Sequence, residues 1–355
     1  MSNETEGMPF ASSIGFSITT RCPVACSHCI VEAGPHRREE MSIDDARNWI
    51  AQAAVYRNGY IKSAVFTGGE PFFNRALLAG LLDCAISHGL VPAVVTNAFW
   101  ATSRDRARET LAGLPQIKLL SISTDVYHQR AIPLKHVRNA IGAAQELGVR
   151  HNLAVCFEDD ADPEFLQLKA GLEQIVDDRL IRLASVFPAG RARKTLKLDR
   201  QIFLNEPAPG PCLGADFPTV FPDGRVVGCM ALLTELPSAH PLYLGSLKIE
   251  TLARILDDAE TNVALHLMRV WGPSRLVSML REAGYEHSLP RKYIKHGHCD
   301  LCYALLGDSG LMTALARLVE DRQLAEETAY ARQFYLKEEE MVHLLQESAP
   351  GGSGR

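Results

Sequence analysis

The chain has 355 residues, of which 46% are hydrophobic and 22% are charged, as expected for one or two globular domains. Its 37 basic and 42 acidic side chains leave a net charge of −5, which argues against binding nucleic acid or an anionic membrane through bulk charge. Apolar runs stay below the ~18 residues of a membrane span, and acidic residues stand where a secretory signal needs basic ones. We therefore expect a cytoplasmic protein with neither a membrane nor a nucleic-acid partner.

The first 190 residues alternate between apolar runs of strand length and segments with helical periodicity. Strands are expected at Ile14–Thr19, Ser63–Thr67, Val91–Thr96, Ile117–Ser123, Asn152–Phe157 and Ile181–Phe187. Helices are expected at Ser42–Arg57, Asn74–His88, Ser103–Leu111, Pro133–Leu147 and Pro163–Val176. Because parallel strands need helical crossovers, this α/β pattern predicts a parallel sheet, either curved and barrel-like or open and doubly wound.

After residue 187 the pattern changes to a segment rich in proline and glycine. Asp223-Gly224 predicts a hairpin turn between strands at Thr219–Phe221 and Arg225–Val227. Helical segments follow at Lys248–Ala283, interrupted at Gly272-Pro273, and at Leu311–Gln346, before a flexible tail. We therefore expect a small α+β extension and C-terminal helices behind the sheet.

Nine cysteines are many for a chain without an export signal, where they are more often metal ligands or catalytic thiols than disulfides. Cys22, Cys26 and Cys29 form a C-x3-C-x2-C motif directly after the first strand. Three thiolates can hold three irons of a 4Fe-4S cluster and leave the fourth iron open to a small chelating molecule. A zinc site completed by His28 or His36 is the alternative.

This cysteine motif, joined to the sequence TGGEP after the second strand, resembles the radical S-adenosylmethionine (SAM) superfamily over residues 14–192. The resemblance implies a partial (β/α)6 TIM-like barrel in which the three cysteines bind a 4Fe-4S cluster. It also implies that the open iron is chelated by the amino and carboxyl groups of SAM. Gly68 and Gly69 would let the backbone approach the ligand, and Glu70 would meet the SAM ammonium group.

The resemblance further implies cofactor contacts at the ends of later strands. His28 stands where the family usually has an aromatic residue beside the adenine, and Asn97 follows the third strand. Ser123 and Asp125 resemble hydroxyl-binding positions, although both equally suit helix caps. Arg191, in the sequence VFPAGRAR, would meet a SAM carboxylate, the substrate or solvent.

Three more side chains are candidates for contact with the substrate, namely Tyr127, His128 and Cys156. Cys156 is either a buried apolar side chain or a thiol donor of a hydrogen atom, as radical epimerases require. Cys84, within a predicted helix, is expected to be a buried small side chain.

A second cysteine set consists of Cys212, Cys229, Cys299 and Cys302. Four thiolates can complete a closed iron–sulfur or zinc site, with the hairpin carrying Cys229 back over Cys212 and the C-x2-C turn closing the site. The set resembles the twitch extension of radical SAM enzymes, the shorter relative of the SPASM extension. That resemblance implies one auxiliary 4Fe-4S cluster, since no cysteine follows Cys302 to hold another.

These patterns divide the chain into four expected parts. They are a flexible segment at 1–13, a radical SAM core at 14–192, a twitch-type auxiliary-cluster domain at 193–310, and a C-terminal helix with a flexible tail at 311–355.

The function implied by the resemblance is reductive cleavage of SAM to a 5′-deoxyadenosyl radical, which abstracts a hydrogen atom from the substrate. An external one-electron reductant of the flavodoxin or ferredoxin type would supply the electron. The first substrate hypothesis is a ribosomally made peptide that is crosslinked, dehydrogenated or epimerised, with a separate protein recognising its leader. The second is a small metabolite, such as an aminocyclitol or sugar-nucleotide-like compound. A non-catalytic iron–sulfur protein is disfavoured because Glu70 and the three cysteines are present.

Overall fold

The computed structural model describes residues 10–186, 189–196, 201–215, 217–229, 240–295 and 297–338. Six strands pair side by side in chain order and run parallel. They are β1 (Ser13–Thr19), β2 (Ser63–Gly68), β3 (Val91–Thr96), β4 (Leu119–Ser123), β5 (Arg150–Phe157) and β6 (Ile181–Ser185). A doubly wound sheet reverses its strand order, so this sequential order confirms the barrel-like (β/α)6 arrangement.

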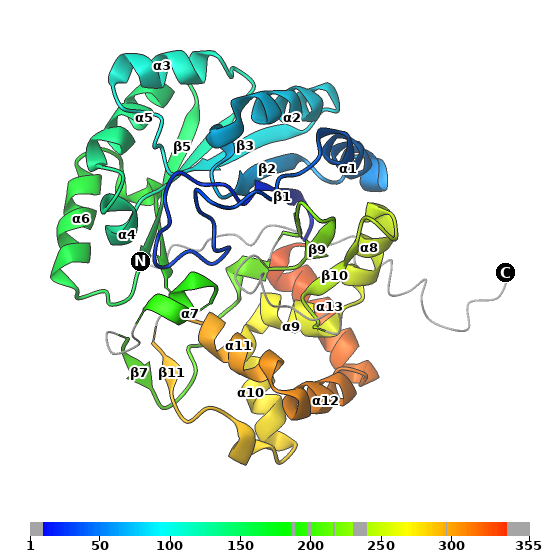
Figure 1. Cartoon of the computed structure of the whole chain (residues 1–355). Helices are drawn as coiled ribbons and strands as arrows, with labels where there is room; N and C mark the ends of the chain where they lie inside the picture. The colour runs from blue at the N-terminus through cyan, green and yellow to red at the C-terminus, as the bar shows by residue number, and fades with distance from the viewer. Residues whose placement is uncertain are drawn as a thin grey trace.

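Helices connect successive strands and cover the outer side of the sheet (Figure 1). They are α1 (Ile43–Val55), α2 (Arg75–Ser87), α3 (Arg104–Ala112), α5 (Leu134–Glu146) and α6 (Pro163–Glu173), each within three residues of its predicted bounds. The side chains of Ser42, Asn74 and Ser103 cap the first three by accepting a backbone N–H three residues further on. A short helix that the sequence did not predict, α4 (Val126–Gln129), follows β4.

The main core lies between this sheet and its helices. β1 is buried along its whole length, and its Phe16 stacks on Phe66 of β2 with ring centroids 5.8 Å apart. Trp49 of α1 and Leu78 of α2 are fully buried against the sheet side of the helices. The apolar stripe of each helix thus faces the strands that it connects.

The predicted hairpin is present, and it extends the main sheet. β8 (Thr219–Val220) and β9 (Arg225–Val227) form the hairpin, and β10 (Tyr243–Ser246) pairs with β9. β8 pairs in parallel with β1, where a Cβ on Gly15 would lie 2.7 Å from Thr219 Oγ1. The expected division near residue 192 therefore cuts across one nine-stranded sheet, since tertiary pairing joins both parts.

The rest of the described chain is mainly helical and lies below the sheet in Figure 1. It comprises α7 (Arg191–Thr195), α8 (Leu252–Glu260), α9 (Val263–Trp271), α10 (Pro273–Glu282), α11 (Cys299–Gly307), α12 (Ser309–Leu318) and α13 (Arg322–Leu336), with a small sheet of β7 (Phe203–Leu204) and β11 (Tyr293–Ile294). The helical segment is interrupted at Gly272, between α9 and α10, as predicted. Among the described helices, none has the length and apolarity that a bilayer crossing requires.

Near the ends of the chain, the described residues differ from two expectations in part. The helical stretch expected at Leu311–Gln346 is two helices, because Asp321 caps a new helix by accepting the N–H of Leu324; residues 339–346 lie outside the described residues. The expected flexible segment at 1–13 is packed from residue 10 onward. Phe10 is fully buried, and its N–H donates to Glu338 at 2.7 Å, so burial and this bond hold it in place.

Candidate functional site

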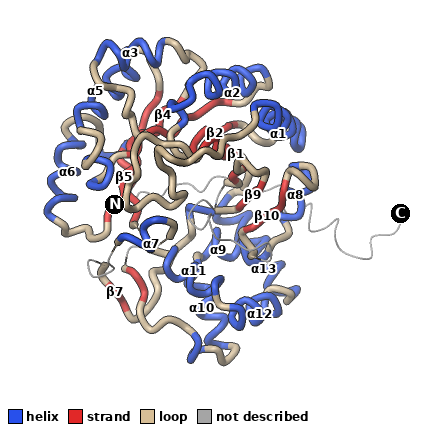
Figure 2. Tube along the Cα trace, viewed as in Figure 1, coloured by secondary structure: helices blue, strands red, loops and turns tan. Residues whose placement is uncertain are grey.

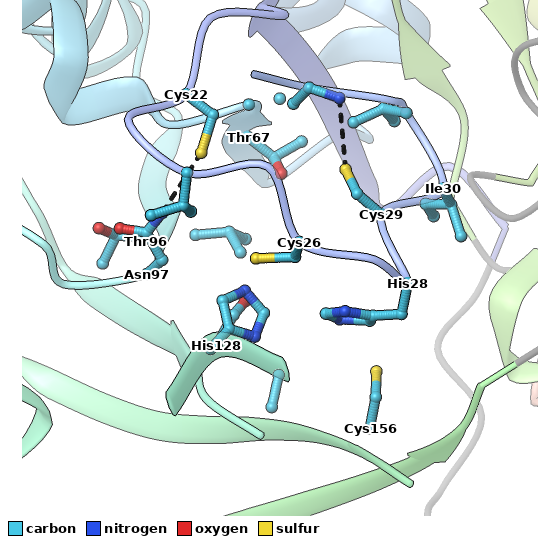
Figure 3. Close-up of a pocket in the computed structure, with 18 of the residues that line it drawn as sticks. Cys22, Cys26, His28, Cys29, Ile30, Thr67, Thr96, Asn97, His128 and Cys156 are labelled. Atoms are coloured by element: carbon cyan, nitrogen blue, oxygen red, sulfur yellow. Dashed lines mark hydrogen bonds between the residues drawn. The ribbon is translucent and has the colours of Figure 1, made fainter. Parts of the chain in front are cut away.

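The three clustered cysteines lie on the long loop between β1 and α1, which Figure 2 shows as irregular chain. Cys22, Cys26 and Cys29 all line one cavity of about 240 Å³. Thr96 and Ser123, the last residues of β3 and β4, line it as well, so the cavity opens at the carboxyl ends of the strands. Figure 3 shows the loop arching over this cavity. In barrel-like sheets this end is where ligands bind.

Gly68 and Gly69 bring the end of β2 against the backbone that precedes Cys22. A Cβ on Gly68, whose φ is +134°, would lie 2.3 Å from Thr19 O, and a Cβ on Gly69 would lie 2.2 Å from Arg21 O. The N–H of Gly69 donates to Thr19 O at 2.6 Å. Both glycines also line the cavity. Both positions thus require glycine, because a side chain at either would clash with the backbone of Thr19 or Arg21.

The sulfur atoms of the loop receive N–H groups from two directions (Figure 3). Ala33 N donates to Cys29 Sγ at 3.3 Å, and Asn97 Nδ2 donates to Cys22 Sγ at 3.5 Å. Burial raises the pKa of Cys22 to about 12, and the negative charges of Glu70, Cys26 and Cys29 add to this rise. Three soft sulfur donors around one cavity suit iron in a cluster.

Glu70 is fully buried beside the cavity and is not part of its lining. Its Oε1 accepts Thr96 Oγ1 at 2.8 Å and Phe72 N at 3.1 Å, while its Oε2 accepts Asn97 N at 2.8 Å. Burial raises the pKa of Glu70 to about 7, against the lowering effect of these hydrogen bonds. The carboxylate therefore ties the end of β2 to the end of β3.

Asp125 organises a cluster of polar side chains at the same cavity. Its Oδ2 lies 3.2 Å from His28 Nε2 and 2.9 Å from His128 Nδ1. Its Oδ1 accepts the N–H groups of Tyr127 and His128, so Asp125 caps α4. Burial opposes ionisation of Asp125, yet the two histidines hold its pKa below the usual range, and Asp125 in turn raises the pKa of His128 to about 10. The three groups stand close enough to share a cation.

The predicted ligand and substrate contacts are divided between the cavity and its surroundings. His28, Gly68, Gly69, Asn97, Ser123, Asp125, His128 and Cys156 line the cavity. Cys156 points toward the ring of His28 in Figure 3, and burial raises the pKa of its thiol far above the usual range. Tyr127 stacks on His28 outside the lining, with ring centroids 4.5 Å apart, and its hydroxyl contacts Glu158. Arg191 also lies outside the lining, bonded to the cysteine loop.

The second cysteine set converges in space. Cys212, Cys229, Cys299 and Cys302 together line a separate small cavity. A Cβ on Gly214 would lie 3.7 Å from Cys229 Sγ and 3.9 Å from Cys212 Sγ, so the glycine leaves room beside two of the sulfurs. Burial raises the pKa of Cys299 and Cys302 well above the usual range, and the neighbouring thiols add to it. Four sulfur donors in one apolar cavity fit a bound metal centre.

The structure corrects the expected C-x2-C turn and adds neighbours that the sequence did not single out. Cys299 and Cys302 lie in the first turn of α11, where a spacing of three residues puts both on one helix face. His298 and Met268 line the same cavity, and Met268 Sδ lies 3.8 Å from Cys302 Sγ. In the sequence, the position of His298 directly before Cys299 could have indicated that it lies at this cavity, whereas nothing in the sequence marks Met268.

Comparisons with known proteins agree with this architecture. The sequence model of the Radical SAM superfamily matches residues 16–169, which include the three-cysteine loop and the Gly-Gly-Glu motif. YydG of Bacillus subtilis (strain 168), which is named for peptide biosynthesis, is 21% identical over 313 residues, covering 84% of this chain and 93% of YydG.

Two solved structures share the fold over most of their length. anSMEcpe with bound AdoMet and the Cp18Cys peptide is 14% identical, with a TM-score of 0.53 over 95% of this chain and 99% of that one. The hexahistidine-tagged anSMEcpe with bound AdoMet is 12% identical, with a TM-score of 0.52 over 90% and 99%. The family match, the cysteine motif and the strand order together identify residues 16–169 as a radical SAM domain.

Proposed function

We propose that the chain cleaves SAM reductively at a 4Fe-4S cluster held by Cys22, Cys26 and Cys29, and that the resulting 5′-deoxyadenosyl radical modifies a peptide. The observation that carries the proposal is the convergence of these three cysteines on one cavity at the carboxyl end of a partial barrel. A three-sulfur set leaves one iron of such a cluster without a protein ligand, which is where a chelating substrate binds.

A 4Fe-4S cluster held by Cys22, Cys26 and Cys29 would supply one electron to the SAM sulfonium, after receiving it from an external flavodoxin or ferredoxin. Cleavage of the C5′–S bond would leave methionine and a 5′-deoxyadenosyl radical able to take a hydrogen atom from the substrate. The protein's task is to orient the reactants and exclude water. The lining of Val24, Ile30, Val31 and Val95 supplies apolar walls for this purpose.

Polar groups along the cavity account for the recognition of SAM. Glu70 places a carboxylate behind Thr96, where it complements an ammonium group. The imidazole of His28 lies on the cavity wall at a position suited to stacking on adenine. Ser123 and Asn97 offer a hydroxyl and an amide to the ribose or carboxylate. Arg191 is left out of this set because it bonds the cysteine loop.

The peptide substrate is supported by the relatives. YydG is named for peptide biosynthesis and aligns with 84% of this chain. anSMEcpe, which shares the fold, was solved with a bound peptide. A separate protein that recognises the leader of the precursor peptide completes the proposed set of partners. Cys156, at the cavity beside His28, is the proposed donor of a hydrogen atom if the modification is an epimerisation.

We also propose that the second cysteine set holds one auxiliary 4Fe-4S cluster, in a twitch-type domain. Its support is the cavity that four sulfurs share and the room that Gly214 leaves beside them. In contrast to the first set, four thiolates can ligate every iron of the cluster. Such a centre can accept an electron from the substrate radical when the product is oxidised.

Formation of 5′-deoxyadenosine tests the first proposal. The protein is reconstituted with iron and sulfide without oxygen, then given SAM and a strong reductant. The chain and a Cys84→Ala control, altered on α2 outside both cysteine sets, are expected to form 5′-deoxyadenosine, whereas Cys26→Ala is not. Equal product from Cys26→Ala, or none from the unaltered chain, would overturn the proposal.

Iron content tests the auxiliary cluster. We expect about eight irons per chain, four for each cluster, and about four in a Cys299→Ala/Cys302→Ala variant. Four irons in the unaltered chain, or bound zinc, would contradict a second iron–sulfur cluster and leave the first proposal standing.

A further inference from the structure

Helix α7 is hydrogen-bonded to the cysteine-bearing loop between β1 and α1 through one residue, Arg191. The main-chain N–H of Arg191 donates to Cys29 O at 3.0 Å. Its Nη1 donates to Cys26 O at 2.8 Å, and its Nη2 donates to Ala33 O at 2.6 Å. One residue therefore satisfies three carbonyl groups of the loop, two of which belong to cysteines. The guanidinium fork, a rigid planar set of donors, fixes the spacing between the carbonyls that it joins.

The neighbours of Arg191 hold the same loop. Gly190 has a φ of +54°, and a Cβ there would lie 2.3 Å from Ile30 O, so glycine allows the two backbones to touch. Thr195 Oγ1 donates to Ser27 O at 2.7 Å, and Lys194 Nζ lies 2.5 Å from Glu32 Oε1. The contacts thus cover the loop from Cys26 to Ala33.

The other side of α7 rests on α11. The guanidinium of Arg193 donates to the hydroxyl of Tyr303 and lies 5.1 Å from the centroid of that ring. Tyr303 directly follows Cys302, and α11 carries two members of the second cysteine set. Residues 191–195 therefore contact both cysteine-bearing segments, which are far apart in the sequence.

We infer that α7 is a brace between the two cysteine sites, and that Arg191 is a positioning residue that sets the geometry of the three-cysteine loop. Both terminal nitrogens of its guanidinium donate to backbone carbonyls, which distinguishes this role from binding a SAM carboxylate. The inference rests on the proposed function only in taking the loop as the cluster-binding loop. It concerns hydrogen bonds between residues of the chain itself.

Hydrogen–deuterium exchange of the full chain tests whether the hydrogen bonds of Arg191 hold residues 26–33 in place. In Arg191→Met, the amides of residues 26–33 are expected to exchange roughly tenfold faster or more, because each lost charge-assisted bond is worth at least a factor of about ten. Arg191→Lys keeps the positive charge but lacks the forked guanidinium, so its exchange rates should lie between those of the unaltered chain and of Arg191→Met. Arg179→Met is the matched control, since Arg179 is exposed and pairs with Asp177 in its own turn. Exchange in Arg191→Met equal to that in Arg179→Met would overturn the inference.

Arg193→Met tests the link to α11, because it leaves the three bonds of Arg191 in place. If α7 connects the two sites, Arg193→Met should also show faster exchange in residues 26–33, by a smaller factor than Arg191→Met. Unchanged exchange there would overturn the bridging role.

Release of iron to a chelator gives the second readout, on reconstituted protein. Arg191→Met should lose iron faster than Arg179→Met, and equal rates would contradict the positioning role. An unaltered chain that binds no iron would sink the proposed function, whereas the exchange experiment would still decide the role of Arg191.

Discussion

Glu70 shows at the scale of one residue how the fold controls a charge. The side chain is fully buried, and burial raises its pKa to about 7 from the ordinary 4.5. An acid whose pKa is raised by folding stabilises the protein below its unfolded pKa, and this contribution is lost as the pH rises through the folded pKa. The charged form that would meet the SAM ammonium thus carries a cost in stability.

The first prediction concerns this pH dependence. The free energy of unfolding of the chain without cofactors, measured relative to Glu70→Gln, should fall by about 3 kcal/mol between pH 4.5 and pH 8. Urea denaturation at several pH values measures the difference, and the glutamine variant supplies the reference without this titration. A difference that stays constant or grows with pH would show that burial does not raise the pKa of Glu70.

The second prediction concerns Gly69. A methyl group there would lie 2.2 Å from Arg21 O, so Gly69→Ala should shift the loop before Cys22 and lower stability by roughly 1–3 kcal/mol. It should also reduce iron bound at the first site after reconstitution. Gly307→Ala is the matched control, because a Cβ at Gly307 meets nothing within 4 Å. Normal iron content in Gly69→Ala would contradict the close packing inferred at this residue.

Single residues also show where sequence analysis reaches its limit. The spacing of Cys22, Cys26 and Cys29 is local, so the motif predicted their convergence. The partners of Glu70 and the bonds from Arg191 to the loop cross between elements distant in the chain. No local pattern encodes such contacts. The sequence suggested a SAM carboxylate, the substrate or solvent as the contact of Arg191, and did not suggest the loop carbonyl groups to which its guanidinium donates.

At the scale of elements, the periodic segments and their parallel barrel-like sheet were predictable, whereas the extension of that sheet by the hairpin was not. The five long helices and six parallel strands follow from apolar periodicity and capping residues. The hairpin of β8 and β9 was also predicted, but its parallel pairing with β1 joins residues about two hundred positions apart. The helix α11 was missed because a C-x2-C spacing fits a turn and a helix equally well.

Helices α9 and α13 are joined by buried charges. Glu338 accepts hydrogen bonds from Arg269 at 2.7 Å, from Arg332 at 2.6 Å and from the N–H of Phe10 at 2.7 Å. Arg332 also pairs with Glu260 of α8 at 2.5 Å. Each charge is buried, so removal of one partner leaves the remaining buried charges with less compensation.

The third prediction follows from this network. Glu338→Ala should lower the free energy of unfolding by about 3–5 kcal/mol, because it removes the carboxylate that two buried arginines share. Asp258→Ala, which breaks the exposed pair with Arg254, should cost less than about 1 kcal/mol. Urea denaturation of both variants measures the contrast, and similar small losses in the two would show that the buried network contributes little.

At the scale of the whole molecule, one nine-stranded sheet carries a cavity with three cysteines, and the helical part carries four more around a second cavity. The contacts of α7 join the two regions. This arrangement supports a reaction at the first site with electron exchange at the second. The identity of the substrate is the feature that least depends on the shared fold, since loops and cavity walls determine it.

The electron paramagnetic resonance spectrum of the reduced, reconstituted chain, recorded with and without SAM, tests the central claim directly. We predict a signal that changes when SAM is added, because SAM would chelate the open iron of the proposed cluster at Cys22, Cys26 and Cys29. In Cys26→Ala the SAM-responsive signal should disappear, while the signal of the proposed second cluster remains. A spectrum that does not respond to SAM, or a response that survives in Cys26→Ala, would contradict the account.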